Sequence, residues 1–141
     1  MQVWHRFGSL FLTLGLAGLG AACQSYSTGG GGTSPDRCAG TAPDRPSYAM
    51  HVQPIFNANC ALSGCHLPPN PQRGLDLSSY NGLMQGSING PVVIPGNAQD
   101  SRLVKRIEGR ETPRMPFNRD PLCQFQIDTI RRWIDQGALN N

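Results

Sequence analysis

The chain has 141 residues, enough for one small domain, and only 15% of them are charged. Its 17 glycines and 12 prolines indicate a large proportion of loop. The formal net charge of +3 is too small to indicate a nucleic-acid-binding protein. Because a domain of this size has a small core, a disulfide, a metal or a cofactor often stabilises it.

Residues 1–22 have the pattern of a signal peptide. His5 and Arg6 precede an apolar stretch that ends in small residues before Cys23. This stretch is too short to span a bilayer, which takes roughly 20 residues. The sequence LGAAC resembles the lipobox of bacterial lipoproteins, which implies lipidation of Cys23. We therefore expect an exported protein, periplasmic or held at the outer membrane by a lipid anchor. The alternative is ordinary secretion with Cys23 as a spare thiol.

Residues 23–46 are predicted to form a flexible linker. Gly, Ser, Thr and Pro dominate this stretch, and no apolar period survives in it. The folded domain is then expected at residues 47–141. A Gly- and Ser-rich tether of this length has a mean span of roughly 25 Å, which suits a domain held near a membrane.

Residues 47–141 carry helical patterns and almost no strand pattern. The predicted helices lie at residues 47–60, 75–86, 100–109 and 120–137. Ser47 is the expected N-cap of the first helix, and Pro54 is expected to bend or shorten it. The last helix is predicted to begin with Asp120 as N-cap and to end at Gly137. The sequence thus predicts an all-α domain of three to five short helices joined by Pro- and Gly-rich loops.

The stretch NCALSGCH places Cys60, Cys65 and His66 close together. Three kinds of site use such residues. A local disulfide between the two cysteines would close a very small loop and leave His66 without a role. A zinc site would need two further ligands, and the candidates are Cys38, His51 and Cys123. Covalent attachment of haem uses all three residues.

In haem attachment, two thiols add to the vinyl groups of the porphyrin, and the following His reaches the iron. The usual spacing has two residues between the cysteines, whereas four separate Cys60 from Cys65. The loop must therefore bulge, and Gly64 permits this because glycine adopts positive φ without strain. Haem attachment is the favoured interpretation, with the disulfide and zinc as alternatives.

The order of several segments resembles a known family. These segments read VQPIFNANC…GCH, GLDLSSYNGLMQG, VVIPGNAQDSRLVKRI, RMPFN and IDTIRRWIDQGA. Together they are similar to the bacterial c-type cytochrome domain of the planctomycete type, over about residues 49–139. The resemblance implies a cytochrome c-like fold whose first and last helices pack together around one haem c. It implies thioethers at Cys60 and Cys65, His66 as the proximal ligand and Met115 as the distal ligand.

The function that follows is one-electron transfer. An iron with His and Met ligands has no open position for a substrate, and Met ligation raises the reduction potential. Since the sequence contains no recognisable catalytic constellation, we expect an electron carrier and no enzyme. Two alternatives are a haem-based sensor or ligand binder, and a haem-free, disulfide-stapled surface module.

The remaining candidates concern charge and the other cysteines. Six basic residues lie between the third predicted helix and the Met115 loop: Arg102, Lys105, Arg106, Arg110, Arg114 and Arg119. They either form a solvated face, or pair with haem propionates and dock an acidic redox partner. Cys38 and Cys123 have no role in haem binding, and in an oxidising compartment we expect them to form a disulfide. His51 is expected at the surface or in the core, and Phe56 and Trp133 in the core.

Overall fold

A computed structural model describes residues 35–141. The predicted signal peptide, Cys23 and the first part of the predicted linker lie outside these residues. Seven helical segments follow in order: η1 (Pro35–Cys38), η2 (Tyr48–Val52), α1 (Gln53–Asn59), η3 (Gln72–Gly74), α2 (Tyr80–Gln85), α3 (Arg102–Ile107) and α4 (Gln124–Asp135). Of these, α1 to α4 are α-helices, η1 and η3 are 3₁₀ helices, and η2 is a π-helical turn. Within residues 35–141, no helix is long and apolar enough to cross a membrane.

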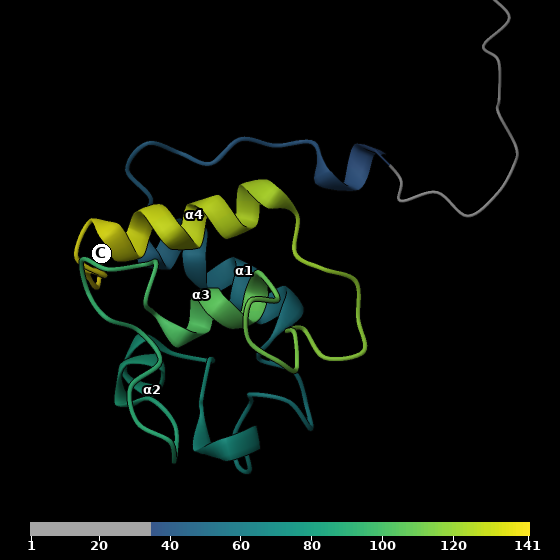
Figure 1. The fold of residues 1–141 in the computed structure, drawn as a ribbon, viewed down its shortest axis with the longest axis vertical. Coiled ribbons are helices and arrows are strands. Elements are labelled where there is room, and N and C mark those ends of the chain that lie inside the picture. Colours follow the sequence, from purple (N-terminus) through teal and green to yellow (C-terminus); the bar gives the residue numbers. More distant parts are fainter. Residues whose placement is uncertain (1–34) are drawn as a thin grey trace, which may run out of the picture. The chain divides into compact units, whose positions relative to one another are not determined.

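The all-α prediction is confirmed for the described residues. They contain no strand, and only one isolated bridge joins Ser87 to Gly90. The short apolar stretch around Val92 and Val93 is buried as irregular chain. Long loops connect the helices, as the glycine and proline content predicts (Figure 1).

The longest helix, α4, organises the core. It packs against η2 and against α3, and α1 continues directly from η2 (Figure 1). The predicted contact between the first and last helical segments is therefore present. Phe56 of α1 and Trp133 of α4 are 0% and 1% exposed, so both are core residues as predicted. Tyr48 and Tyr80 pack on Trp133, with ring centroids 5.2 and 6.4 Å from it.

Pro54 determines where the first helix changes geometry. The Ser47 side chain accepts a hydrogen bond from Met50 N–H at 3.2 Å, which confirms it as the N-cap. The N–H of Gln53 bonds to the carbonyl of Tyr48, five residues back, in a π-helical turn. Pro54 follows and has no N–H to continue that pattern, so regular α-helix begins around it. The predicted bend appears as this change from π-helix to α-helix.

Helix α4 begins later than the sequence predicts. Its N-cap is Cys123, and Asp120 instead forms an ion pair with Arg37 at 2.6 Å. The Gln126 side chain accepts a hydrogen bond from the Cys123 N–H at 3.0 Å, and so satisfies a donor that the helix leaves unpaired. The predicted end is confirmed. Gly137 has φ +100°, and the N–H groups of Gly137 and Ala138 bond back to the carbonyls of Ile134 and Trp133.

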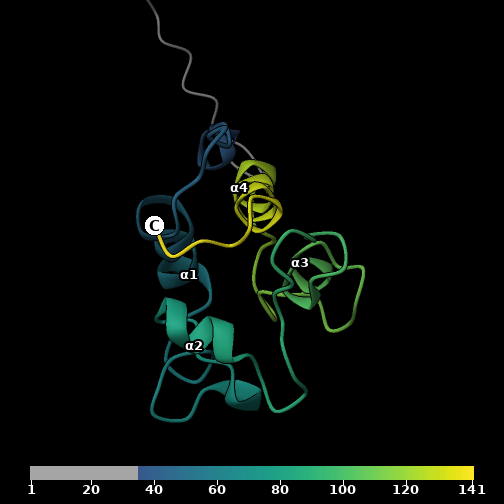
Figure 2. The same cartoon turned by 90° about the vertical axis from the view of Figure 1, so that its left-hand side faces the viewer.

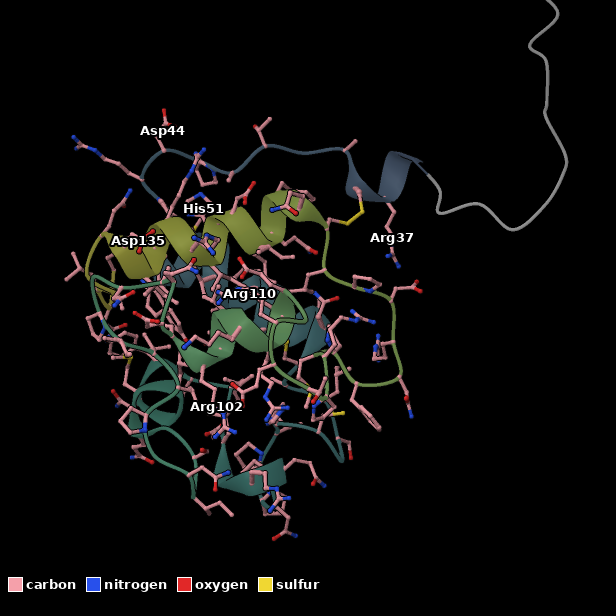
Figure 3. All side chains as sticks on the ribbon, in the orientation of Figure 1. Arg37, Asp44, His51, Arg102, Arg110 and Asp135 are labelled. Atoms are coloured by element: carbon pink, nitrogen blue, oxygen red, sulfur yellow. A yellow bond between two sulfur atoms is a disulfide. The ribbon has the colours of Figure 1, made fainter. Side chains whose placement is uncertain are left out.

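The segment before the first helix is attached to α4. Cys38 and Cys123 form the predicted disulfide, with their Cα atoms 5.2 Å apart; it joins η1 to the start of α4 (Figure 3). Farther along, Arg132 donates to the carbonyls of Ala42 and Pro43 at 2.7 and 3.2 Å. Residues 35–46, predicted as the end of the linker, are thus held to the helical unit at several points.

Candidate functional site

A cavity of about 700 Å³ lies among the end of α1, η3, α3 and the loop before α4. This volume falls within the range of about 300–1,000 Å³ that is typical of small-molecule and cofactor sites. Five buried aliphatic side chains form much of its wall: Leu75, Leu77, Val92, Leu103 and Ile107. The two views place η3 and α2 below α1 and α3, on the side away from α4 (Figures 1 and 2).

The loop between Cys60 and His66 is folded into a compact turn at this cavity. The carbonyl of Cys60 accepts hydrogen bonds from Leu62 N–H at 2.9 Å and from His66 N–H at 3.1 Å. Gly64 has φ +75°, the positive value predicted for the bulge. The two extra residues are therefore taken up inside the turn. Cys60, Cys65 and His66 all line the same cavity.

The His66 ring is oriented by a backbone carbonyl. Its Nδ1 lies 3.1 Å from the carbonyl oxygen of Leu75. A carbonyl only accepts hydrogen bonds, so Nδ1 carries the proton and Nε2 keeps its lone pair. Burial lowers the pKa of His66 below its ordinary value, which favours the neutral ring that a metal requires. The residue that supplies this acceptor, Leu75, lies nine positions after His66 in the sequence.

Both thiols of the motif are free in the structure. The predicted alternative of a Cys60–Cys65 disulfide is therefore not formed. Burial, and secondarily the neighbouring Cys65, raises the pKa of Cys60 to about 12, so its thiol is protonated at neutral pH. In the part of the chain that the structure describes, no group of three His, Cys, Asp or Glu side chains could hold a metal. The zinc alternative thus lacks its further ligands there.

Met115 is the only methionine of residues 35–141 that lines the cavity. Its N–H bonds to the carbonyl of Arg106 at 2.9 Å, which ties the Met115 loop to α3. The side chain of Met84 packs against the core, and that of Met50 is 74% exposed. His51 accepts a hydrogen bond from Ser47 N–H at its Nδ1 and does not line the cavity. The structure thus brings Met115, and neither of the other methionines nor His51, to the cavity that His66 lines.

The cavity wall is positively charged. No described acidic residue lines it. Four arginines do: Arg73, Arg102, Arg106 and Arg119. The sequence singled out the last three of these. Among the other predicted basic residues, Lys105 pairs with Asp100 at 3.4 Å and Arg110 pairs with Glu108. The predicted basic face is therefore partly neutralised away from the cavity, as a solvated face would be.

These residues fit a covalently held haem. Two thiols and one neutral imidazole line an aliphatic cavity, and a thioether sulfur lines the same space. Thiols, imidazole and thioether are the donors that c-type haems use. Guanidinium groups at the cavity suit a ligand that carries carboxylates.

The comparison with known families agrees with this chemistry. Residues 63–116 match the family model described as planctomycete cytochrome C. The match confirms the resemblance found in the sequence and supports a planctomycete-type cytochrome c domain. It includes Cys65, His66 and Met115, and it leaves out Cys60 and α4. No curated protein and no solved structure matches the chain.

Several cavity residues could not be identified from the sequence. Leu75 supplies the acceptor for His66 nine residues along the chain, and Arg73 of η3 joins the other arginines. Asn59 and Asn89 are further polar lining residues. The segment around Arg73 has no apolar period that would signal a wall.

Proposed function

We propose that this protein is a c-type cytochrome that carries one electron on a single covalently bound haem c. The observation that supports this most strongly is the shared cavity of Cys60, Cys65, His66 and Met115. The family match over residues 63–116 supports the same class of protein. A cytochrome c-like fold accounts for the packing of η2 against α4 and for the position of the motif at the end of α1.

Each residue has a distinct task. Cys60 and Cys65 would hold the haem through thioether bonds, and His66 Nε2 and Met115 Sδ would be the protein's ligands to its iron. When bound, the haem supplies a reversible one-electron couple. The Leu75 carbonyl fixes the orientation of the His66 ring through Nδ1. The aliphatic wall would keep water away from the haem. This would favour the less charged, reduced state of the iron and would prevent water from replacing the Met115 thioether as a ligand.

The remaining parts of the proposal concern location and partners. The signal pattern of residues 1–22 supports export, and Cys23 would carry a lipid anchor to the membrane. The arginines at the cavity support a redox partner protein with an acidic docking surface. Nucleic acid is not expected as a partner, because the net charge of +3 is small.

One experiment tests both haem and attachment. The mature protein is produced in a host with haem-attachment machinery and analysed by pyridine haemochrome spectroscopy and by intact mass after denaturation. We expect one haem per chain and a mass increased by one haem. The Cys60→Ser/Cys65→Ser variant should lose the mass increase, whereas Met50→Ala, at an exposed site, should keep it. A denatured protein at the apoprotein mass would contradict the proposal.

A second measurement separates a carrier from a gas sensor. The reduced protein is exposed to carbon monoxide, and the difference spectrum is recorded. With Met115 bound at the distal position we expect little change, because a carrier has no open coordination site. Rapid and complete formation of a carbon monoxide complex would favour the sensor alternative.

A further inference from the structure

Two arginines of α3 that line the cavity converge on one carboxylate, that of Glu111. Arg102 approaches Glu111 Oε1 with Nε at 2.8 Å and Nη2 at 2.7 Å. Arg106, one helical turn later, donates from Nη2 to the same oxygen at 3.0 Å. Both arginines line the cavity, and Figure 3 shows Arg102 below α3 in that view.

This cluster has an unbalanced positive charge. Two guanidinium groups face one carboxylate, and no other acidic side chain of residues 35–141 pairs with either arginine. An arginine has five N–H donors. Arg102 uses some of its donors for Glu111. Arg106 uses one for Glu111 and one for the carbonyl of Pro113 at 3.0 Å. Each arginine therefore keeps N–H groups that can bond to a further acceptor. A second carboxylate would neutralise the cluster and use these donors.

The cluster is also partly shielded from water. The side chains of Arg102, Arg106 and Glu111 are 36%, 20% and 32% exposed. Charge-assisted hydrogen bonds are stronger in such surroundings than at a fully exposed surface. The position of both arginines on α3 fixes their spacing before any ligand binds. Arg73 and Arg119, by contrast, are exposed, and Arg119 lies in the loop before α4.

We infer that Arg102 and Arg106 together bind one carboxylate substituent of the tetrapyrrole, and that Glu111 neutralises the second positive charge. This inference rests on the proposed function. A c-type haem keeps two propionate carboxylates after its vinyl groups have formed thioethers, so the ligand has the required group. Arg102 and Arg106 are then positioning residues for the haem. Glu111 limits how strongly they attract the carboxylate and how positive the surroundings of the iron are.

The test separates the carboxylate contact from general stability by changing the ligand. Full-length mature protein carrying Cys60→Ser and Cys65→Ser can hold haem only without a covalent bond, so any binding is reversible and its affinity can be measured. Iron(III) protoporphyrin IX and its dimethyl ester are titrated into it, and the Soret band is followed. We expect the acid to bind at least about tenfold more tightly than the ester, the equivalent of one charge-assisted hydrogen bond.

Added substitutions then assign the contact. Arg102→Gln should bring the ratio of the two affinities close to one, and Glu111→Gln should increase it. Arg119→Gln, at another arginine of the cavity, is the matched control. Loss of the ratio in Arg119→Gln with no loss in Arg102→Gln would overturn the inference. Equal binding of acid and ester by the parent would also overturn it. If neither ligand binds without the thioethers, the reduction potentials of the covalently loaded protein decide, and failure of covalent haem loading would overturn the proposed function itself.

The reduction potential of the covalently loaded protein provides an independent readout. Glu111→Gln removes a negative charge beside the cavity, which disfavours the more positive oxidised state, so the potential should rise. Arg102→Gln removes a positive charge, and the potential should fall. Shifts of opposite sign are not expected from simple loss of packing. Shifts of the same sign, or no shift in either variant, would contradict the inference.

Discussion

Removal of the Cys38–Cys123 disulfide should destabilise the protein mainly through its unfolded state. The two residues are separated by 85 positions in the sequence. Cross-linking a loop of that size lowers the conformational entropy of the unfolded chain. On the loop-entropy estimate this raises the free energy of the unfolded state by about 4.5 kcal/mol at 25 °C. The ion pair of Arg37 with Asp120 and the bonds of Arg132 to residues 42 and 43 do not depend on the disulfide, so the folded state loses little.

The assay is urea unfolding of haem-loaded mature protein with Cys38→Ala and Cys123→Ala, compared with the parent. We expect the free energy of unfolding to fall by roughly 2–4 kcal/mol, the usual measured range. The dependence of that free energy on urea concentration should become steeper, because the unfolded chain without the cross-link exposes more surface. Reduction of the parent by a phosphine should reproduce both changes, since it leaves thioethers intact. A loss of stability with an unchanged urea dependence would refute this reasoning and indicate damage to the folded state.

Three further predictions concern the cavity and the core. Met115→Ala should abolish the weak near-infrared sulfur-to-iron band of the oxidised protein and lower the reduction potential; the assignment is wrong if only Met84→Ala does so. Ile130→Ala should lower the free energy of unfolding in urea by about 2–5 kcal/mol, because Ile130 is 0% exposed in the core. A loss below 1 kcal/mol would show that the core collapses around the gap. Gly64→Ala places a side chain at a residue with positive φ, so the free energy of unfolding should fall by about 1–2 kcal/mol. Haem loading, measured as the ratio of Soret to protein absorbance, should fall as well. Gly90→Ala is its matched control, at positive φ and also with open space around the added methyl group; equal haem loading of both variants would contradict a special role for Gly64.

Features set by near neighbours in the chain could be predicted from the sequence. The Ser47 cap, the change of helix geometry at Pro54 and the positive φ of Gly64 each depend on a few adjacent residues. The helical patterns predicted four segments because apolar side chains recur on one face. The three donors Cys60, Cys65 and His66 were recognisable because a short chain holds them together.

Features that depend on contacts between distant segments became visible only in the folded protein. Asp120 was a reasonable cap in sequence, but Arg37, 83 residues away, pairs with it, and α4 begins after Cys123. Competing partners such as this one are invisible to local patterns. The carbonyl that accepts the hydrogen bond of His66 belongs to Leu75, nine residues along the chain, and only the path of the loop brings it there.

The charges at the cavity also depend partly on the local sequence and partly on contacts between distant segments. The sequence shows that arginines are dense between residues 102 and 119 and that two glutamates lie among them. It did not determine which arginines pair with acids and which line the cavity, because that depends on the fold of the loop after α3. In the folded protein, Glu111 is bonded through its N–H to the Lys105 carbonyl at 3.1 Å, which sets its side chain between Arg102 and Arg106. Local sequence thus determines which groups are available, and packing across the chain determines which of them meet.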